Sequence, residues 1–346
     1  MSFSKVLFIG LGGAGQRHLR ILKQMLPSDT VFMAYRRTRK TPLLRADFSV
    51  DNQNTIESAY DLQVFDSLDL AFSNSPDLTV ISTPTSCHRE PMMIAMKSGS
   101  GVLVEKPWAE NLQDFQEFRD GMINKNLPFQ ISFQRRFHKL ISEANDLIKS
   151  GAIGKPVAAT FNVYSYVPSW HGYEDWQNLY AVRADLGGGV LLTEIHEIDL
   201  AYWFFGLPDS VFCSGGNRGV NKLDVEDTIQ MTLLYKSVSV QITLCFMHKK
   251  PSRSFHIAGT EGDIKWDDKE NVLTVNSFNG TSTEHTDMDF SNDDMFISQA
   301  EKFIKNWKSE DTKNSLSAAY SSLAIVDAAK LSMKSGNVED IISLPY

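Results

Sequence analysis

The stretch that decides the fold is KVLFIGLGGAG, residues 5–15 of a chain of 346 residues. The apolar run from Lys5 to Ile9 predicts a buried strand, and the residues after the glycines follow the period of a helix to about Leu26. The glycines therefore lie between a strand and a helix, with the spacing Gly-x-Gly-x-x-Gly. In this context the first glycine allows a tight turn, the second lets a ligand approach the backbone, and the third lets the helix pack on the strand.

This glycine-rich turn is a candidate phosphate site. The first amides of a helix have no partner within the helix, and the helix dipole places partial positive charge at the same end. The turn therefore predicts dinucleotide binding, with a βα turn that holds no ligand as the alternative. The residues expected to hold the pyrophosphate are Gly10, Gly12, Gly13, Ala14 and Gly15.

The end of the second strand bears on the choice of cofactor. This strand, expected over residues 30–35, should end beside the adenosine ribose, where an Asp or Glu would bind the 2′-hydroxyl of NAD. The chain instead has Arg36 and Arg37, inside a basic run that continues to Lys40. Guanidinium groups suit a 2′-phosphate, so NADP is favoured over NAD. An ordinary solvated basic loop is the alternative.

Strand and helix patterns keep alternating to about residue 133, which predicts a doubly wound parallel sheet. Ligands bind at the carboxyl ends of the strands in such a sheet. One expected strand, residues 78–82, is followed by Thr83, Pro84 and His88. We expect these residues near the nicotinamide half of the cofactor. The alternative for His88 is a helix-start histidine whose ring is satisfied by the protein itself.

A further strand, residues 102–105, ends abruptly in Lys106 and Pro107. Because proline biases the preceding residue toward extended backbone, Lys106 should project from the strand end rather than begin a helix. An ammonium group at this edge of the sheet is well placed to meet a substrate oxygen. The alternative is a surface lysine at a strand-to-loop corner.

The pattern changes after residue 133, so we expect two domains, residues 1–133 and 134–346. Beyond Val211 several segments alternate apolar and polar residues, which predicts an α+β domain with an open, largely antiparallel sheet. An aromatic-rich loop over residues 166–180 contains Trp170. This loop is either a lid over a sugar-like ligand or an oligomer contact.

A helix is expected over residues 190–206, shortly after Arg183 and a run of three glycines. Thr193, His196 and Asp199 are spaced three apart and would share one face of this helix. A histidine with a nearby carboxylate is a proton carrier near neutral pH. A core histidine bound to a backbone carbonyl is the alternative.

The composition excludes several classes of protein. A net charge of −8 argues against a nucleic-acid binder, which needs a concentrated basic surface. No segment approaches the roughly 18 apolar residues of a membrane span, and the apolar run after Lys5 is too short for a signal peptide. Three widely spaced cysteines suit reduced thiols, so a cytoplasmic location is expected. The scattered histidines predict no metal site.

Together these motifs resemble the glucose-fructose oxidoreductase/inositol dehydrogenase family, written Gfo/Idh/MocA. The resemblance covers nearly the whole chain and implies an N-terminal Rossmann domain followed by a C-terminal α+β domain. It also implies a homo-oligomer, dimer or tetramer, and NAD(P)-dependent hydride transfer at a hydroxyl or keto carbon of a sugar, cyclitol or nucleotide-sugar. The motifs that carry it are Gly10-x-Gly12-x-x-Gly15, Thr83-Pro84 with His88, Glu105-Lys106-Pro107, and the triple glycine followed by His196-x-x-Asp199.

The resemblance also implies roles for single residues. Lys106 and His196 would flank the reacting hydroxyl or carbonyl, while Glu105 and Pro107 would help to seat the cofactor. With candidates from the aromatic loop and the glycine-helix segment added, the expected substrate contacts are Lys106, Trp170, Arg183, Thr193 and His196.

The chain departs from the family pattern at one point. Many members carry an Asp one helical turn before this histidine, where this chain has Leu192 and Thr193 in a register one residue shorter. The acid/base duty would then fall to His196 itself or to Lys106. Two other functions stay open: a dinucleotide- or sugar-sensing regulator without turnover, and redox-assisted elimination or glycoside cleavage.

Overall fold

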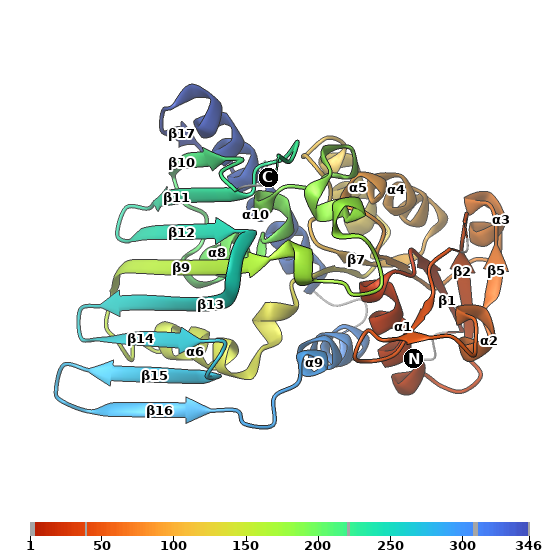
Figure 1. Cartoon of the computed structure of the whole chain (residues 1–346), viewed down its shortest axis with the longest axis horizontal. Coiled ribbons are helices and arrows are strands. Elements are labelled where there is room, and N and C mark those ends of the chain that lie inside the picture. Colours follow the sequence, from red (N-terminus) through yellow and green to blue (C-terminus); the bar gives the residue numbers. More distant parts are fainter. Residues whose placement is uncertain (1–3, 39, 220–221, 307–310, 345–346) are drawn as a thin grey trace. The chain divides into compact units, whose positions relative to one another are not determined.

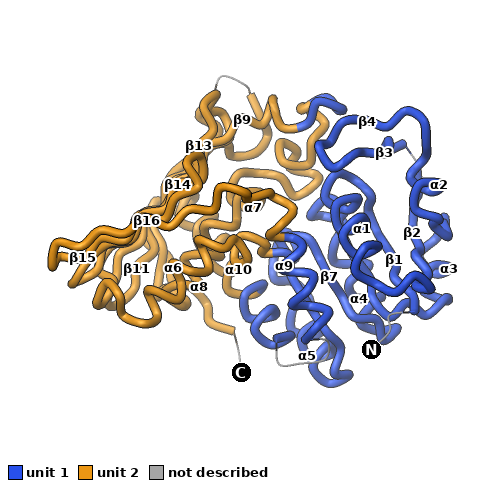
Figure 2. The backbone as a smooth tube through the Cα atoms, turned by 90° about the horizontal axis from the view of Figure 1, so that it is seen from below, with its two compact units in different colours: residues 1–132, 171–175, 296–319 blue, residues 133–170, 176–295, 320–346 orange. Residues whose placement is uncertain are grey.

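The computed structural model describes residues 4–38, 40–219, 222–306 and 311–344 (Figure 1). The chain divides into two compact units, which Figure 2 colours separately. Unit 1 contains residues 1–132, 171–175 and 296–319, and unit 2 contains residues 133–170, 176–295 and 320–346. Within the described ranges, no helix combines the length and the apolar character that crossing a membrane requires.

Unit 1 is built on a six-stranded sheet with the order β5-β2-β1-β6-β7-β8, in which every neighbouring pair is parallel. The order reverses between β1 and β6, the point at which doubly wound sheets bind their ligands. This confirms the Rossmann domain expected from the sequence. The sheet strands are β1 (Lys5–Ile9), β2 (Val31–Tyr35), β5 (Gln63–Phe65), β6 (Leu78–Ile81), β7 (Gly101–Glu105) and β8 (Phe129–Ser132), with a hairpin of β3 (Leu43–Leu44) and β4 (Val50–Asp51) beside them. The helices are α1 (Gly13–Met25), α2 (Ile56–Tyr60), α3 (Leu68–Ser73), α4 (Arg89–Ser98) and α5 (Phe115–Asn124).

The core of unit 1 fixes the helix that follows the glycine-rich turn. Phe8 of β1 is fully buried in an apolar cluster that includes Leu19 and Leu22 of α1. Phe296, from the sequence-distant helix α9 (Asn292–Lys305), joins the same cluster. Because packing holds α1 along its length, the first amides of this helix keep a fixed position at the end of β1.

Unit 2 is built on a nine-stranded sheet with the order β16-β15-β14-β13-β9-β12-β11-β10-β17. Every neighbouring pair is antiparallel except β9 with β12, so the sheet is largely antiparallel as expected. In β11, Ile229 and Met231 are buried while Gln230 is exposed, which is the alternation expected of a sheet covered on one face. The strands are β9 (Pro156–Tyr166), β10 (Ser210–Gly216), β11 (Thr228–Leu234), β12 (Ser239–Cys245), β13 (Met247–Gly259), β14 (Gly262–Asp267), β15 (Val272–Ser277), β16 (Ser282–Thr286) and β17 (Glu339–Asp340).

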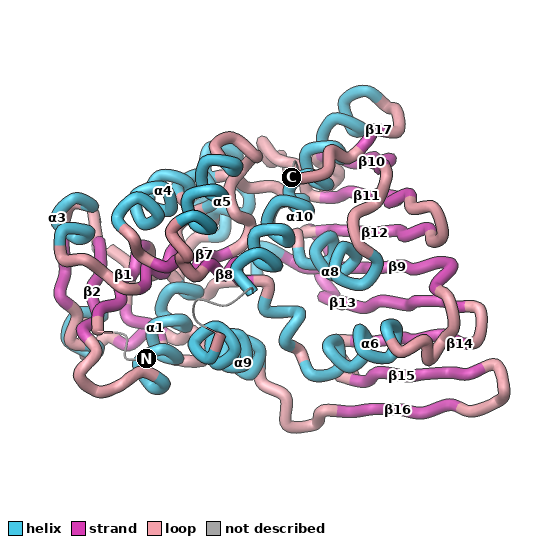
Figure 3. The backbone as a smooth tube through the Cα atoms, turned by 180° about the vertical axis from the view of Figure 1, so that it is seen from behind, coloured by secondary structure: helices cyan, strands magenta, loops and turns pink. Residues whose placement is uncertain are grey.

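Helices cover one face of this sheet (Figure 3). α6 (Lys139–Lys149) packs on β14 and β15, and α8 (His196–Phe205) packs on β9 and β12. The long helix α10 (Asp311–Ser335) also reaches the sheet, because the Ser332 hydroxyl accepts a hydrogen bond from the amide of Cys213 on β10 at 2.9 Å. The covered face therefore positions α8, the helix that begins with His196.

The helix expected over residues 190–206 is two helices in the structure. α7 (Val190–Thr193) ends at Glu194, whose ψ of 34° lies outside the α region, and α8 begins two residues later. We attribute the break to a long-range contact, because Arg253 of β13 binds the Glu194 carboxylate at 2.5 Å. His196 therefore starts a helix, and the expectation of one continuous helix face is wrong.

Candidate active site

The glycine-rich turn has the geometry of a close-approach site. Gly10 has a φ of +89°, and a Cβ atom there would lie 2.6 Å from the carbonyl carbon and oxygen of Ser82, at the end of β6. A Cβ atom on Gly15 would lie 2.3 Å from the carbonyl oxygen of Gly10. Both positions therefore require glycine, as the sequence predicts.

The same turn is open where a phosphate would approach. Among the described residues, a Cβ atom on Gly12 would meet nothing within 4 Å. Gly12 is the N-cap of α1, and the described part of the chain gives this helix no side-chain cap and no acidic residue in its first turn. The uncovered backbone at Gly12 and the positive end of the α1 dipole are left for an anion. These residues fit the pyrophosphate of a dinucleotide.

The end of β6 adds a hydroxyl group without a partner. Thr83 Oγ1 is buried and has no hydrogen-bond partner within the ranges that the structure describes. Buried polar atoms are nearly always paired, so such an atom indicates a group that a ligand completes. Pro84 then begins a short 3₁₀ turn, Thr85–Cys87. The position of Thr83 at the switch point of the sheet fits contact with a bound cofactor.

His88 contacts the backbone of the loop that follows β6. The side chain is 1% exposed, with Nδ1 2.9 Å from the carbonyl oxygen of Pro107 and Nε2 2.8 Å from that of Thr83. Burial lowers the pKa of the ring. The imidazole therefore ties together the loops that follow β6 and β7. Both ring nitrogens thus face backbone carbonyls, and contact of His88 with a bound cofactor stays a prediction.

Glu105 and Lys106 follow one another at the end of β7. The Glu105 carboxylate lies 2.8 Å from Nε2 of His18 on α1. Burial alone would raise the pKa of Glu105, but the hydrogen bond and charge of His18, with the charge of Lys106, lower it overall. An ionised Glu105 thus anchors the strand end to α1. Lys106, which is half-buried, leaves the strand beside this carboxylate, and its peptide bond to Pro107 is cis.

The basic residues after β2 bear on the expected choice of cofactor. Arg36 is 7% exposed, and its guanidinium binds the Glu57 carboxylate at 2.8 Å and the carbonyl oxygen of Thr41 at 3.2 Å. Its charge is matched by Glu57, so contact of this guanidinium with a 2′-phosphate stays a prediction. Arg37 is exposed, and Arg39 lies outside the described residues.

In unit 2, His196 lies at the first turn of α8 and is 5% exposed. Its ring packs edge-on against Phe133, and its Nε2 lies 3.4 Å from Nε2 of Gln134. Gln134 Oε1 is buried and, in the described part of the chain, has no hydrogen-bond partner. An amide oxygen of this kind beside a histidine indicates a place for a ligand hydroxyl. Sequence reasoning missed Gln134, which no motif marks.

The carboxylate expected to orient His196 has another partner. Both oxygens of Asp199 accept hydrogen bonds from Arg136, at 2.8 and 2.6 Å. Asp199 is 1% exposed, and burial raises its pKa. This contact holds α8 to the segment Gln134–Phe137, so it positions the helix that carries His196.

Two buried glutamates flank His196. Glu194 and Glu197 are 6% and 2% exposed, and Arg253 contacts them at 2.5 and 3.4 Å respectively. The pKa of Glu197 is raised to about 7, chiefly by burial. The charge of Arg253 lowers this pKa, and the charge of Glu194 raises it further. Sequence reasoning missed this cluster. The available signal was that Glu194 and Glu197 lie in a segment whose neighbours are largely apolar, although His196 and Asp199 lie there too. The arginine that pairs with Glu194 lies 59 residues further on.

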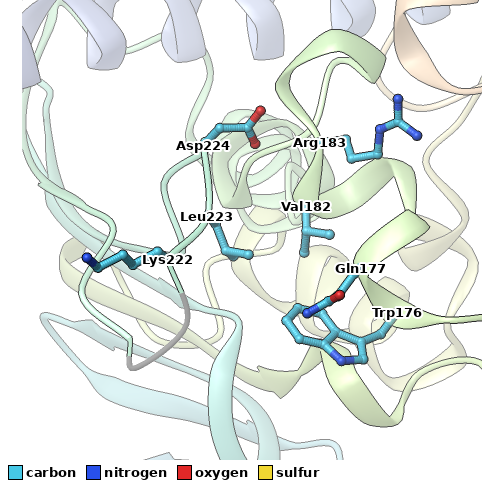
Figure 4. Close-up of a pocket in the computed structure, with 7 residues that line it drawn as sticks. All are labelled: Trp176, Gln177, Val182, Arg183, Lys222, Leu223 and Asp224. Carbon is cyan, nitrogen blue, oxygen red and sulfur yellow. The ribbon is translucent and has the colours of Figure 1, made fainter.

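Unit 2 also contains an open pocket of about 440 Å³, a volume typical of small-molecule sites. Figure 4 shows Trp176 and Gln177 on one side of it and the segment from Lys222 to Asp224 across from them. Arg183 lies at this pocket and donates two hydrogen bonds to Asp185, at 3.0 and 2.6 Å. The lining residues are Trp176, Gln177, Val182, Arg183, Lys222, Leu223 and Asp224.

Two expected substrate contacts lie elsewhere. Trp170 packs edge-on against Phe246 with 5.5 Å between ring centroids and is not among the residues that line the pocket. Thr193 is 2% exposed at the end of α7. The described ranges contain no group of three or more His, Cys, Asp or Glu side chains arranged for a metal ion.

The doubly wound sheet and its open glycine turn define a protein of the class that binds a nicotinamide dinucleotide. Residues 4–133 match the family model described as an oxidoreductase family with an NAD-binding Rossmann fold. Residues 141–265 match the model of the GFO/IDH/MocA C-terminal domain. The chain belongs to the Gfo/Idh/MocA family of oxidoreductases.

Two curated relatives illustrate the range of the similarity. The 1,5-anhydro-D-fructose reductase of Ensifer adhaerens is 28% identical over 54% of this chain and 56% of the relative. The 2,7-anhydro-N-acetylneuraminate hydratase of Escherichia coli strain K12 is 28% identical over 68% of this chain and 63% of the relative. The chain thus spans between about half and two thirds of the length of these relatives.

Solved structures share the fold over almost the whole chain. Levoglucosan dehydrogenase in complex with NADH and L-sorbose superposes with a TM-score of 0.81 at 17% identity, covering 99% of this chain and 100% of that one. The WlbA dehydrogenase from Bordetella pertussis, in complex with NADH and UDP-GlcNAcA, superposes with a TM-score of 0.76 at 17% identity, covering 99% of both chains. At these identities the likeness establishes the fold.

Proposed function

We propose that the protein is an NAD(P)-dependent oxidoreductase that transfers a hydride between a nicotinamide cofactor and a hydroxyl or keto carbon of a sugar, cyclitol or nucleotide-sugar. The observation that carries the proposal is the end of β7. There a half-buried lysine, beside an ionised glutamate, leaves a parallel sheet whose glycine turn is open for a pyrophosphate. The names of the relatives support the substrate class, since they include a sugar reductase and a levoglucosan dehydrogenase.

In the proposed reaction the bound nicotinamide supplies the acceptor or donor of the hydride. In the oxidation direction His196 takes the proton of the substrate hydroxyl as general base. Lys106 donates a hydrogen bond to the same oxygen and stabilises the negative charge that develops on it. Gln134, whose Oε1 is buried next to His196, accepts a hydrogen bond from a neighbouring substrate hydroxyl.

We further propose that the pocket of unit 2 binds the part of the substrate remote from the reacting carbon. Trp176 offers an apolar ring surface for the C–H groups of a sugar. Arg183 and Asp224 offer a donor and an acceptor for its hydroxyl groups, and Lys222 suits an acidic substituent. The pocket volume of about 440 Å³ has room for more than a single monosaccharide ring.

The cofactor preference proposed from the sequence, NADP over NAD, now depends mainly on Arg37. Arg36 is paired with Glu57, whereas Arg37 is exposed just beyond the end of β2. A comparison of the dissociation constants of NADPH and NADH decides the question. Tighter binding of NADH would overturn the preference for NADP.

A second candidate function is a redox-neutral reaction in which the cofactor is reduced and reoxidised within one cycle. The E. coli relative named as a hydratase, which aligns with 68% of this chain, favours it. A sensor without turnover is less well supported, because a sensor needs neither Lys106 nor His196. We retain the expectation of a cytoplasmic homo-oligomer as part of the proposal, and light scattering of the purified protein tests the oligomeric state.

A screen of sugars and nucleotide-sugars with the purified protein separates these functions. A dehydrogenase changes the absorbance of reduced nicotinamide in proportion to product. A redox-neutral enzyme forms product without net change in that absorbance, and a sensor binds ligand without forming product. Lys97→Ala, an exposed lysine of α4, is the matched control for Lys106→Ala.

A further inference from the structure

We propose that Tyr173 is a ligand of the cofactor pyrophosphate, with its hydroxyl donating a hydrogen bond to a phosphate oxygen at the glycine-rich turn. The inference rests on the proposed dinucleotide binding and adds to it a residue that no sequence motif marks. Tyr173 belongs to residues 171–175, a short segment that groups with unit 1 through its contacts although its chain neighbours belong to unit 2.

The Tyr173 hydroxyl lies directly over the start of α1. A Cβ atom added to Gly13 would be 3.1 Å from this hydroxyl oxygen and 2.8 Å from the ring of Phe48. The Gly13 amide also faces the Tyr173 oxygen closely enough to lower the pKa of the phenol slightly, against the larger effect of burial. Two aromatic side chains from distant parts of the sequence therefore stand beside one of the amides expected at the pyrophosphate.

The neighbouring glycine is uncovered. A Cβ atom on Gly12 would meet nothing within 4 Å among the described residues. The open space at the N-terminus of α1 therefore lies over Gly12, and the Tyr173 hydroxyl lies over the next residue, Gly13. In the proposal, a pyrophosphate oxygen in this space has the phenol over Gly13 as its neighbour.

Phe48 forms a second wall beside Gly13, and its backbone conformation there is strained. Its φ of +64° is unusual for a residue with a bulky side chain, and its amide closes a turn by donating to the carbonyl oxygen of Arg45 at 3.0 Å. The guanidinium of Arg17 stacks on the Phe48 ring at 4.8 Å and on the Phe296 ring at 4.7 Å. Strained backbone of this kind is concentrated at ligand sites, which supports a binding role for the wall that Phe48 forms.

The chemistry of Tyr173 suits a donor. Burial raises the pKa of its phenol, and the Glu174 carboxylate raises it further, so the hydroxyl keeps its proton at neutral pH. A hydroxyl accepts one hydrogen bond while donating another. In the structure the hydroxyl proton is turned toward the Glu174 carboxylate, and His171 Nδ1 lies 3.4 Å from the oxygen. Donation to a phosphate oxygen therefore replaces the contact with Glu174 when the dinucleotide binds. The ring is oriented in advance, because it stacks on His171 at 5.1 Å, and His171 lies 2.8 Å from Glu174.

The test is the affinity of the Tyr173→Phe variant for NADH and NADPH, measured by fluorescence titration without substrate. Loss of a hydrogen bond to a charged oxygen should raise the Kd of the dinucleotide that the wild type binds by at least about tenfold. The Kd of adenosine, which has no phosphate, should stay unchanged. Tyr164→Phe on β9 is the control and should bind the dinucleotide like the wild type. A thermal melt of each variant checks that the fold is retained.

Unchanged affinity in Tyr173→Phe would overturn the assignment. So would tighter binding, which would make the hydroxyl an internal competitor for the phosphate site. If the wild type binds neither dinucleotide, the assignment and the proposed function both fail. If it binds a dinucleotide but turns over no sugar, only the proposed function fails, and the titration still decides the role of Tyr173.

Discussion

Replacing Glu197 with Gln should change how the stability of the protein depends on pH. Glu197 is 2% exposed beside Arg253, and burial raises its pKa from 4.5 to about 7. Between these values the folded protein holds a proton that the unfolded chain has released. The stability contributed by this proton is complete below about pH 4.5 and is lost as the pH rises toward 7. A pKa change of this size corresponds to about 3 kcal/mol.

Urea unfolding of the wild type and Glu197→Gln at about pH 5 and about pH 8 tests this linkage. Near pH 5 glutamine imitates the protonated carboxyl group, so the two proteins should have similar free energies of unfolding. Near pH 8 the variant should be more stable by about 2–3 kcal/mol, because the wild type carries a buried charge that Arg253 shares with Glu194.

Glu284→Gln, at an exposed position on β16, is the control for the loss of a negative charge. Its stability difference from the wild type should not depend on pH in this way. A Glu197→Gln difference that stays constant from about pH 5 to about pH 8, or a variant that is less stable at the higher pH, would refute the assignment of a buried proton to Glu197.

Three further substitutions test other parts of the structure. Gly10→Ala should lower the free energy of unfolding by at least about 2 kcal/mol, because its Cβ would lie 2.6 Å from Ser82 at a positive φ; an unchanged urea midpoint would contradict this. Glu57→Gln should increase the affinity for NADPH relative to NADH by about tenfold in fluorescence titrations, since Arg36 loses its anionic partner, and an unchanged ratio would argue against it. Trp176→Ala should raise the KM of the sugar by about tenfold while the Kd of the cofactor stays constant; a normal KM would remove Trp176 from the substrate site.

The parts of the site that the sequence predicts are those that depend on local structure. The spacing of Gly10, Gly12 and Gly15 defines a strand, a turn and a helix within a single short segment, and the structure has all three. The placement of Lys106 follows in the same way from a proline that comes directly after an apolar strand. Such features need no knowledge of what lies elsewhere in the fold.

The parts that the sequence does not predict are long-range pairings. Glu57 matches the charge of Arg36 from a separate helix, a pairing that the basic run in the sequence does not show. Arg253 of β13 forms an ion pair with Glu194, and we attribute the end of α7 at this point to that contact. The hydrophobic pattern predicts one continuous helix here. Asp199 likewise forms an ion pair with Arg136, whereas the sequence suggests that it orients His196. Each pairing is decided by tertiary contacts that periodicity and spacing do not encode.

Gln134 and Tyr173 were missed for a related reason. Gln134 is defined by one buried oxygen without a partner in the described ranges, and Tyr173 by contact with a turn 160 positions earlier, at Gly13. Both are ordinary polar residues in loops or short turns, where sequence patterns are weakest. Their roles become visible only when burial and distance are known.

The central claim is that Lys106 acts on the reacting oxygen of a sugar substrate rather than on cofactor binding. Its most direct test is to measure kcat and the cofactor Kd together for the wild type and Lys106→Ala, with the best substrate from the screen. We expect kcat to fall by about 10²–10³-fold, while the Kd of the cofactor changes far less. Turnover at the wild-type rate in Lys106→Ala, or a loss confined to cofactor affinity, would contradict the claim.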